Sequence, residues 1–357
     1  MNSVRPEAEL FIGLVGAGVD VTVFTQADSV YAERMRAAGV EVIDFAPRGK
    51  IALRSVRFLR SAFVSGRFDV VYAFNNKAIA NTNMAALGLP LKVVTYRGQT
   101  GNVHRFDPSV YLTHLHPRVD AVIAVAEAVS DSLRPHLRSN QRIFTVYKGH
   151  DLDWYRDAPL DRARIGLDDS HCVLTCVANN RPRKGIPVLL DAFSRLDTIE
   201  ALRLVLIGSG MDAATLGPPL ADLGLTERVV PLGFRSDAPA VLAASDFSVL
   251  PAIKREGLPK SVIESMAYGV APIVTDTGGS AELVADRESG LVVPPADPAA
   301  LVSAIETLAR DPALCERLGA AAQRRIAERF SVARSVEGTL TALTRIVTAE
   351  RNPASKI

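Results

Sequence analysis

Residues 247–275 have the sequence FSVLPAIKREGLPKSVIESMAYGVAPIVT, and this stretch decides the fold. The apolar run at 247–250 has the length of a buried strand, and a charged loop follows it. Pro259 and Ser261 suit the start of a helix over 261–268, and a second apolar run follows at 271–275. A strand, a helix and a second strand in this order form the repeating unit of a parallel sheet.

The same alternation extends over the rest of the chain in two series. In the first series we expect strands at 19–24, 40–45, 69–74, 91–96, 121–125 and 143–147, with helices at 31–38, 53–64 and 77–87. In the second we expect strands at 172–177, 203–207, 229–232, 247–250, 271–275 and 291–293, with helices at 187–196, 213–223, 238–244, 261–268 and 298–308. We therefore predict an α/β fold of two Rossmann-like, doubly wound domains that face each other across a cleft.

The predicted domains are residues 1–155 and residues 156–325, followed by a helical tail at 326–357 that returns to the first domain. The start of the chain is unusual, because a helix-like stretch at 7–15 stands where a doubly wound domain begins with a strand. Either the first strand is missing from this chain or the sheet is built without it. We favour a shortened N-terminus.

Composition excludes several classes of protein. Hydrophobic residues make up 48% and charged residues 22% of the 357 residues, which is typical of a globular protein and not of a disordered one. The net charge of +2 argues neither for nor against binding to nucleic acid, and we expect no nucleic-acid partner. No apolar run is long enough to cross a membrane. Three cysteines cannot build a disulfide framework, and Cys172 and Cys176 lie in an apolar strand as core residues. We expect a cytoplasmic protein.

Two carboxylates stand out in the 247–275 segment. Glu256 lies in the loop after a strand, and Glu264 lies one to two turns into the following helix. The N-terminus of that helix offers free backbone N–H groups and a partial positive charge, which suit a diphosphate. Glu264 could accept hydrogen bonds from the vicinal hydroxyls of a ribose, and Glu256 could meet a sugar. Two unrelated surface glutamates could have the same spacing, so the spacing alone does not identify a binding site.

The surrounding sequence resembles glycosyltransferase family 4, the retaining group with the GT-B fold. The resemblance rests on the Glu256–Glu264 segment, on Thr277-Gly-Gly279 after the next strand, on Leu206-Ile-Gly-Ser-Gly210 and on Pro231-Leu-Gly-Phe234. It implies that Glu256 contacts the transferred sugar and that Glu264 holds the ribose of the donor. It also implies a wider donor site that includes Gly257, Leu258, Pro259, Lys260, Gly208, Gly210, Asn179 and Gly233.

The loop Ala178-Asn-Asn-Arg-Pro-Arg-Lys-Gly185 follows the first strand of the second series. The family places an arginine and a lysine here to neutralise the donor diphosphate, and fixed cations lower the barrier because the leaving group gains negative charge. Lys184 matches the family lysine, whereas Asn179 occupies the position of the family arginine. We take Arg181 as the substitute, with Arg183 behind it. Catalytic roles are thus predicted for Glu256, Lys184 and Arg181.

Asp151-Leu-Asp153 has the form of a metal-binding Asp-x-Asp motif. Its surroundings match the segment that joins the two domains in family 4, so we interpret it as structural and predict no metal site. We therefore expect a metal-independent enzyme that requires no cofactor besides its nucleotide-diphosphate sugar donor.

The first domain is predicted to bind the acceptor. Glu9, in the stretch that replaces the family's glycine-bearing turn, is expected to line the cleft. Arg97 and His104 lie in a long polar loop after a strand, where binding residues commonly lie. The resemblance implies that a histidine near this place touches the donor sugar, and both residues are candidates for that contact. Asn75 also follows a strand and is expected to face the acceptor. For Arg97 and His104 a plain surface position is an equally good interpretation.

A basic amphipathic stretch includes Arg54, Arg57 and Arg60, interleaved with Leu53 and Phe58. Such a helix could hold the protein against anionic lipid at the inner face of the membrane, although a charge run is more often a solvated face.

The predicted function is the transfer of a hexose from a nucleotide-diphosphate sugar to a glycan or lipid-linked acceptor, in cell-surface polysaccharide synthesis. Two alternatives stay open. One is a nucleotide-sugar epimerase of the GT-B fold, and the other is a non-catalytic subunit that binds nucleotide sugars. The sequence does not identify the base, the sugar or the acceptor.

Overall fold

The computed structural model describes residues 4–47, 49–101, 103–139 and 141–348. The chain divides into two compact units, one formed by residues up to His150 together with those from Phe330 onward, and the other by Asp151–Arg329. Each strand and helix predicted between residues 7 and 308 is present within three residues of its expected bounds. Of the helical tail predicted at 326–357, the helix at Val332–Thr348 is present, and positions 349–357 lie outside the described residues. Two short helices that the sequence pattern did not indicate, α5 (Glu127–Leu133) and α10 (Ser280–Leu283), are present in addition.

The first unit contains six strands and the helices that connect them, within the described residues. Its strands are β1 (Thr22–Thr25), β2 (Glu41–Asp44), β3 (Val70–Ala73), β4 (Lys92–Arg97), β5 (Ala121–Ala124) and β6 (Arg142–Thr145). Its other α-helices are α1 (Arg5–Gly16), α2 (Ala32–Ala37), α3 (Leu53–Gly66), α4 (Asn76–Ala85) and α13 (Val332–Thr348), and short 3-10 turns lie at Pro108–Leu112 (η2) and Arg134–His136 (η3). β1 pairs with β2, and β3, β4, β5 and β6 form a separate parallel sheet in chain order.

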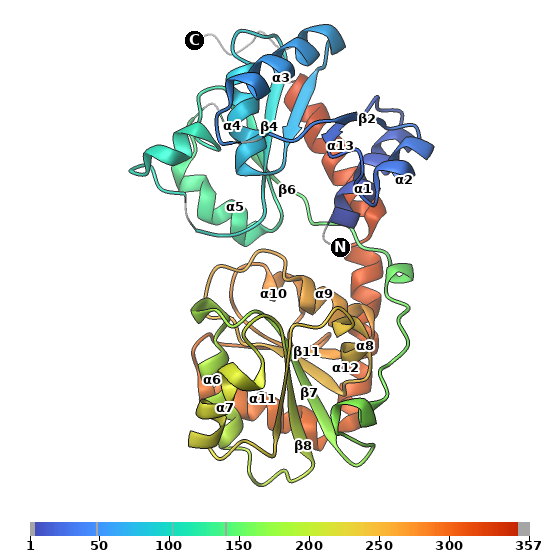
Figure 1. The fold of residues 1–357 in the computed structure, drawn as a ribbon, viewed down its shortest axis with the longest axis vertical. Coiled ribbons are helices and arrows are strands. Elements are labelled where there is room, and N and C mark those ends of the chain that lie inside the picture. The colour runs from blue at the N-terminus through green and yellow to red at the C-terminus, as the bar shows by residue number, and fades with distance from the viewer. Residues whose placement is uncertain (1–3, 48, 102, 140, 349–357) are drawn as a thin grey trace. The chain divides into compact units, whose positions relative to one another are not determined.

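Buried apolar residues explain the central strands of the larger sheet. Val93 and Val94 of β4 and all four residues of β5 are buried, as expected for strands that are covered on both faces. α13 covers one face through Ala342 and Ile346, which pack with Val94 and Ile123. The last helix of the chain therefore completes the core of the first unit, and Figure 1 shows it beside α1.

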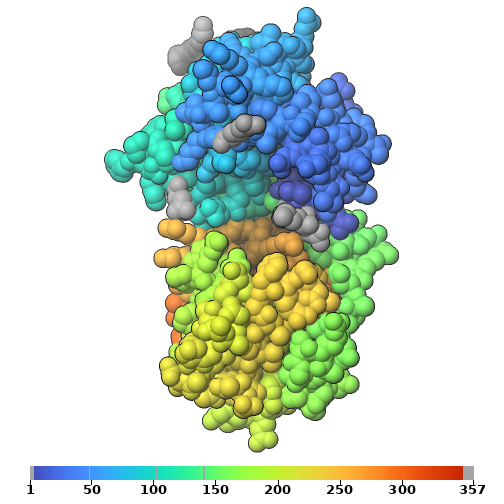
Figure 2. Space-filling view, viewed as in Figure 1, coloured from blue at the N-terminus to red at the C-terminus, as the bar shows by residue number. Residues whose placement is uncertain are grey.

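α3 is amphipathic, as the sequence indicates. Its Leu59 and Phe63 are buried in the core, and Arg54 and Arg57 are exposed. The helix lies at the surface of the first unit, as its blue segment in Figures 1 and 2 shows. Arg60 instead donates hydrogen bonds to the carbonyls of Ala85 and Leu87, at 2.9 and 2.7 Å, and so caps the end of α4. A contact of this helix with anionic lipid remains a prediction. Among the described residues, no helix is both long enough and apolar enough to span a bilayer.

The second unit has one parallel sheet of six strands in the order β12-β11-β10-β7-β8-β9. The strands are β7 (Cys172–Val177), β8 (Leu202–Ile207), β9 (Val229–Gly233), β10 (Phe247–Leu250), β11 (Ala271–Thr275) and β12 (Leu291–Val293). Helices lie at α6 (Ile186–Ser194), α7 (Ala213–Asp222), α8 (Ala238–Ala243), α9 (Lys260–Ala267), α11 (Pro298–Arg310) and α12 (Pro312–Arg329), with 3-10 turns at Leu152–Trp154 (η4), Arg162–Ile165 (η5) and Pro182–Lys184 (η6). Helices flank the sheet on both sides in Figure 1.

The cysteines belong to the core of this unit. Cys176 on β7 is fully buried, and burial raises the pKa of its thiol to about 12. Cys172, at the start of the same strand, is partly buried, and none of the three cysteines forms a disulfide. The interpretation of Cys172 and Cys176 as residues of a packed strand is confirmed.

Candidate functional site

The candidate site lies where the order of the strands reverses in the second unit. β7 is the first strand of this sheet in the sequence, and its neighbours are β8 on one side and β10 on the other. In doubly wound sheets, ligands commonly bind at such a reversal, at the carboxyl ends of the two strands. The loop after β7 carries Arg183 and Lys184, and the loop after β10 carries Glu256.

Glu256 joins the two loops. Its carboxylate oxygen Oε1 lies 2.8 Å from Lys184 Nζ and 3.0 Å from Arg183 Nη1. The three side chains are largely withdrawn from water, with exposed fractions of 6% for Glu256, 14% for Lys184 and 28% for Arg183. Two cations thus meet one anion, and the cluster keeps a net positive charge. A partly desolvated site of this kind favours an anionic ligand, since charges interact more strongly away from bulk water.

The backbones of the loops hold this cluster in place. Ile253 N donates a hydrogen bond to Arg183 O at 2.9 Å. Gly185 adopts a φ of +71°, and a Cβ atom at this position would lie 1.9 Å from the carbonyl oxygen of Pro251. Only glycine allows this close approach in a left-handed conformation, so the sequence Lys184-Gly185 fixes where the lysine emerges.

Arg183, rather than the predicted Arg181, contacts Glu256. Residues 182–184 form the 3-10 turn η6, and Arg181 is the extended residue that precedes it. Lys184 N donates to Arg181 O at 2.8 Å, so the backbone of Arg181 closes the turn while its side chain is exposed. Within the described part of the chain, the Arg181 side chain forms no hydrogen bond or ion pair. Sequence spacing alone does not decide between Arg181 and Arg183, because the turn determines which arginine faces the next loop.

Asn179 connects the loops after β7 and β8. Its side-chain oxygen accepts a hydrogen bond from Ser209 N at 3.2 Å. In the loop after β8, Gly208 has a φ of +145°, and a Cβ atom there would lie 2.0 Å from the carbonyl oxygen of Ala178. Gly208 N donates to Gly233 O at 2.9 Å. Three residues predicted to bind the donor, Asn179, Gly208 and Gly233, thus join the carboxyl ends of β7, β8 and β9, and Gly210 lies in the loop after β8.

Glu264 belongs to the first turns of α9 and is 7% exposed. Its Oε1 accepts a hydrogen bond from Lys260 Nζ at 2.6 Å, one turn earlier on the same helix. α9 begins after Pro259 without a side-chain cap. The first amide groups of the helix therefore point out of its N-terminal end, as they do in every α-helix. Gly257 and Leu258 link Glu256 to this helix end, so the six predicted residues between Glu256 and Glu264 lie on one continuous segment.

The predicted residues of the first unit have individual structural roles. Glu9 is part of α1 and not of a turn, and its carboxylate pairs with Arg34 of α2, with Arg34 Nε 2.7 Å from Oε1. Asn75 caps α4 by accepting a hydrogen bond from Ala78 N at 2.9 Å. His104 is exposed and lies edge-on to His136. Each of the three side chains therefore contacts another residue of the first unit.

Arg97, in contrast, is 8% exposed and supports its own loop. Its Nε donates to Gln99 O at 2.9 Å, and its guanidinium also contacts Gly101 O. It lines a small cavity of about 60 Å³ together with His114 and Asn76. Burial, assisted by the positive charge of Arg97, lowers the pKa of His114 to about 3, so this imidazole is neutral at physiological pH.

Asp151 and Asp153 have structural partners in the second unit. Asp151 accepts a hydrogen bond from Asp153 N at 3.0 Å and caps η4, while Asp153 pairs with Arg156. No group of three or more metal-binding side chains occurs among the residues that the structure describes.

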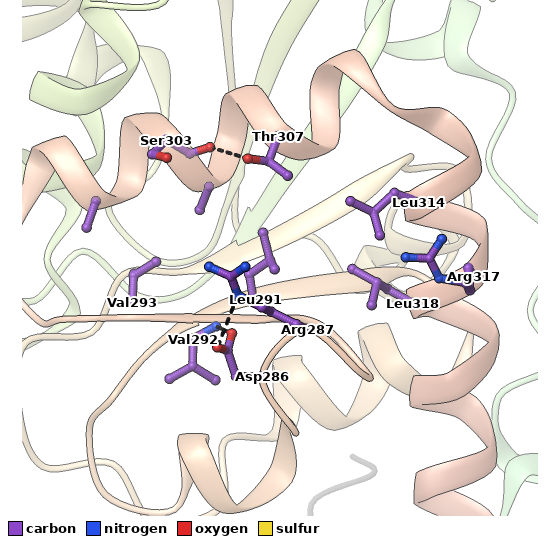
Figure 3. Close-up of a pocket in the computed structure, with 12 residues that line it drawn as sticks. Asp286, Arg287, Leu291, Val292, Val293, Ser303, Thr307, Leu314, Arg317 and Leu318 are labelled. Carbon is purple, nitrogen blue, oxygen red and sulfur yellow. Dashed lines mark hydrogen bonds and ion pairs between the residues drawn. The ribbon is translucent and has the colours of Figure 1, made fainter.

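A larger hollow of about 430 Å³ lies elsewhere in the second unit (Figure 3). The edge strand β12 and the helices α11 and α12 form its walls, and Figure 3 shows Arg287 and Arg317 among its lining side chains. None of the residues predicted to bind the donor lines it. We assign the candidate site to the Glu256 cluster because charged groups from separate loops converge there, which the hollow at β12 does not offer.

Comparison with known proteins places this geometry in a family. The sequence model described as "Glycosyltransferase Family 4" matches residues 8–154, and the one described as "Glycosyl transferases group 1" matches residues 157–325. Together the two matches cover most of both units, and α13 lies outside them. The chain belongs to glycosyltransferase family 4. The resemblance inferred from the Glu256–Glu264 segment is thereby confirmed.

Two curated relatives illustrate the similarity. The N-acetyl-alpha-D-glucosaminyl L-malate synthase of Bacillus anthracis is 26% identical over 266 residues, which are 73% of this chain and 70% of that protein. A D-inositol 3-phosphate glycosyltransferase of Rhodococcus opacus is 33% identical over 237 residues, 62% of this chain. The matched region spans about half the length of the second relative, 52%.

The solved structure of Anabaena Alr3699/HepE in complex with UDP superposes with a TM-score of 0.76 at 21% identity, covering 96% of this chain and 97% of that one. This family 4 chain therefore has the GT-B fold, which consists of two Rossmann-like units with parallel sheets.

Proposed function

We propose that this family 4 chain is a retaining glycosyltransferase that transfers a hexose from a nucleotide-diphosphate sugar to a glycan or lipid-linked acceptor in cell-surface polysaccharide synthesis. The observation that carries the proposal is the cluster of Lys184, Arg183 and Glu256 at the carboxyl ends of β7 and β10. The UDP named in the complex of the Anabaena relative supports a nucleotide-diphosphate donor.

The cluster suits a reaction in which a diphosphate leaves. As the bond between the anomeric carbon and the phosphate oxygen breaks, negative charge collects on the diphosphate. The net positive charge of two cations against one carboxylate stabilises that charge, because the groups are already positioned before the reaction begins. The N-terminal end of α9, which follows Glu256 within four residues, adds backbone N–H groups and a partial positive charge. This chemistry requires no metal ion.

In this proposal the two glutamates bind different parts of the donor. Glu264, held by Lys260, accepts hydrogen bonds from the ribose hydroxyls, and Glu256 orients the transferred sugar next to the cations. The acceptor hydroxyl attacks the anomeric carbon on the face that the diphosphate leaves, and a phosphate oxygen takes its proton. The new glycosidic bond then keeps the anomeric configuration of the donor.

A screen of UDP-, GDP- and ADP-sugars tests the proposal. A donor present at about 100 times its Kd stabilises the protein by about 2.7 kcal/mol, which corresponds to a rise in Tm of about 4 °C for a chain of this length. The same donor, labelled in its sugar, should then give a labelled glycan or lipid product with the anomeric configuration retained. An epimerised donor would favour the epimerase instead, and binding without any product would favour a non-catalytic subunit. A chain that no nucleotide sugar stabilises would contradict the proposal.

The contrast between Arg183 and Arg181 gives a sharper test. We expect Arg183→Gln to lower kcat/KM by about 10-fold, because it removes a charge-assisted contact with Glu256 and one cation from the cluster. Arg181→Gln should change kcat/KM by less than about 2-fold, because this exposed side chain lies outside the cluster. Both variants remove one positive charge from the same loop, so each controls for the other. Steady-state kinetics with the donor found above measures both, and a larger loss for Arg181→Gln would restore the assignment made from the sequence.

A further inference from the structure

Arg97, at the end of β4, is a buried cation without a counter-ion. Its Nε and Nη2 donate hydrogen bonds to the carbonyls of Gln99 and Gly101. Among the residues that the structure describes, Nη1 has no hydrogen-bond partner, and no carboxylate forms an ion pair with the guanidinium. Buried charges in proteins are normally paired or bound to a ligand, because an isolated charge is costly to remove from water. The uncompensated charge of Arg97 therefore indicates a site for an anion.

The guanidinium of Arg97 lines the cavity of about 60 Å³ in the first unit. A cavity needs roughly 10–15 Å³ to hold one water molecule, whereas the sites of whole drug-sized ligands measure roughly 300–1,000 Å³. The cavity therefore holds one small group, and it is too small for a nucleotide or an oligosaccharide. A larger ligand would place a single group inside and leave the rest of the molecule outside.

A second buried side chain of the lining also keeps a polar atom available. His114 is 2% exposed, and its Nδ1 lies 3.0 Å from Thr95 Oγ1. Its other ring nitrogen, Nε2, has no hydrogen-bond partner within the described part of the chain. The ring is neutral at physiological pH, so it offers a hydrogen bond to a ligand without adding a charge. Arg97 and His114 thus both present an unpaired nitrogen in the same cavity.

The exposed residues of the lining add positive charge. Lys50, Asn76 and Ser109 line the cavity and are exposed, so they mark its mouth. α4 begins at Asn76, and its first turn contributes backbone N–H groups and a partial positive charge. Asp107 accepts a hydrogen bond from Ser109 N at 2.8 Å, but its carboxylate is exposed to water. Within the described residues, the lining itself carries the cations Lys50 and Arg97 and no carboxylate.

This set of groups suits a phosphate better than a carboxylate. A phosphate monoester carries a charge of about −1.5 to −2 at pH 7 and has three acceptor oxygens. It can therefore accept hydrogen bonds from Arg97, from Lys50 and from the first turn of α4 at the same time, whereas a carboxylate has one charge and two oxygens. The site also lies after the end of β4, and ligands of doubly wound sheets bind at the carboxyl ends of the strands.

We propose that this cavity binds the phosphate group of a phosphorylated acceptor, with Arg97 at its base and Lys50 and the first turn of α4 at its mouth. The inference rests on the function proposed above, since only a transferase needs an acceptor, and it narrows the acceptor to a phosphate monoester of a sugar or of a lipid. The rest of the acceptor, including the hydroxyl that attacks the donor, stays outside the cavity.

Titration of the full chain with inorganic phosphate, in the absence of donor, tests the site. We expect saturable changes in the amide chemical shifts of Asn76, Arg97 and Ser109 in NMR spectra. Arg97→Gln should weaken phosphate binding by about 10-fold or more, and Lys50→Gln by about 3-fold or more, because each removes a charge-assisted contact. Lys50→Gln keeps the test valid if Arg97→Gln disturbs its loop, because within the described residues the Lys50 side chain forms no hydrogen bond or ion pair.

Lys77→Gln is the matched control. It removes the same charge from the first turn of α4, but Lys77 is exposed and lies outside the lining, so the affinity should change by less than about 2-fold. Shift changes confined to the residues around Lys184 would show that phosphate binds only at the Glu256 cluster. That result, or equal affinities of wild type, Arg97→Gln and Lys50→Gln, would refute the proposal.

Two pairs of probes identify the source of the phosphate. Glucose phosphate is compared with glucose, and short-chain phosphatidic acid is compared with the matching diacylglycerol. We expect the phosphorylated member of one pair to cause the same amide changes as phosphate, and identical spectra within both pairs would contradict the proposal. No donor is present, so these outcomes do not depend on transferase activity. Transfer to an acceptor without phosphate, at a kcat/KM that Lys50→Gln and Arg97→Gln leave unchanged, would overturn this inference and leave the proposed function intact.

Discussion

Replacing Lys184 with alanine is expected to lower kcat/KM by about 100- to 1,000-fold. The lysine is the less exposed of the two cations in the cluster, at 14%, and its Nζ lies 2.8 Å from Glu256. A largely desolvated cation interacts strongly with charge that develops on a leaving group, and water cannot fully replace it. The fold should survive, because Glu256 keeps its ion pair with Arg183 in this variant.

Two further substitutions separate charge from packing at Lys184. Lys184→Met keeps the length of the side chain without its charge and should be as impaired as Lys184→Ala, whereas Lys184→Arg should recover part of the activity. Arg195→Gln removes an exposed cation at the end of α6 and serves as the control, with an expected change of less than about 2-fold. Wild-type kcat/KM in Lys184→Met would show that the positive charge has no part in catalysis.

Replacing Glu256 with glutamine is expected to lower kcat/KM by about 100-fold and to lower Tm by a few degrees as well. The carboxylate is almost fully buried and neutralises two cations that lie within about 6 Å of each other, since both contact its Oε1. Without it Lys184 and Arg183 repel each other, so the loops after β7 and β10 lose the ion pairs that join them. Stability and activity therefore fall together.

A double variant distinguishes the two effects. Glu256→Gln combined with Arg183→Gln removes the repulsion, and Tm should return towards the wild-type value while kcat/KM stays low. Glu306→Gln, which breaks an exposed ion pair on α11, should leave both quantities unchanged. Recovery of activity together with Tm in the double variant would mean that Glu256 acts through folding alone.

Much of the architecture could be predicted from local patterns. The strand predicted at 172–177 is β7 and has the same bounds in the structure. The strands predicted at 247–250 and 271–275 are β10 and β11, also with the same bounds. These strands are buried on both faces, so their sequences are continuously apolar and easily recognised. α10 was not predicted, because a helix of four residues is too short to show a periodic pattern.

The candidate site was less predictable than the strands around it. Arg181, Arg183 and Lys184 lie within four positions of one another, and composition alone does not distinguish the two arginines. Glu9 shows the same limit, because its partner Arg34 is 25 residues away in the sequence and belongs to another helix. Such pairs form only when the chain folds back on itself, and no local spacing encodes them.

The sequence by itself determined the α/β class, the position of each strand and the segment from Glu256 to Glu264, because these depend on residue type and on periodicity over a few neighbours. Only the tertiary structure decided which cations meet Glu256, since the 3-10 turn η6 and the close approach of Gly185 to Pro251 orient the side chains. It also showed that, among the described residues, β1 pairs with β2 while β3 belongs to a separate sheet with β4, β5 and β6. The pairing of strands is a long-range property, so only the folded chain shows which strands become neighbours.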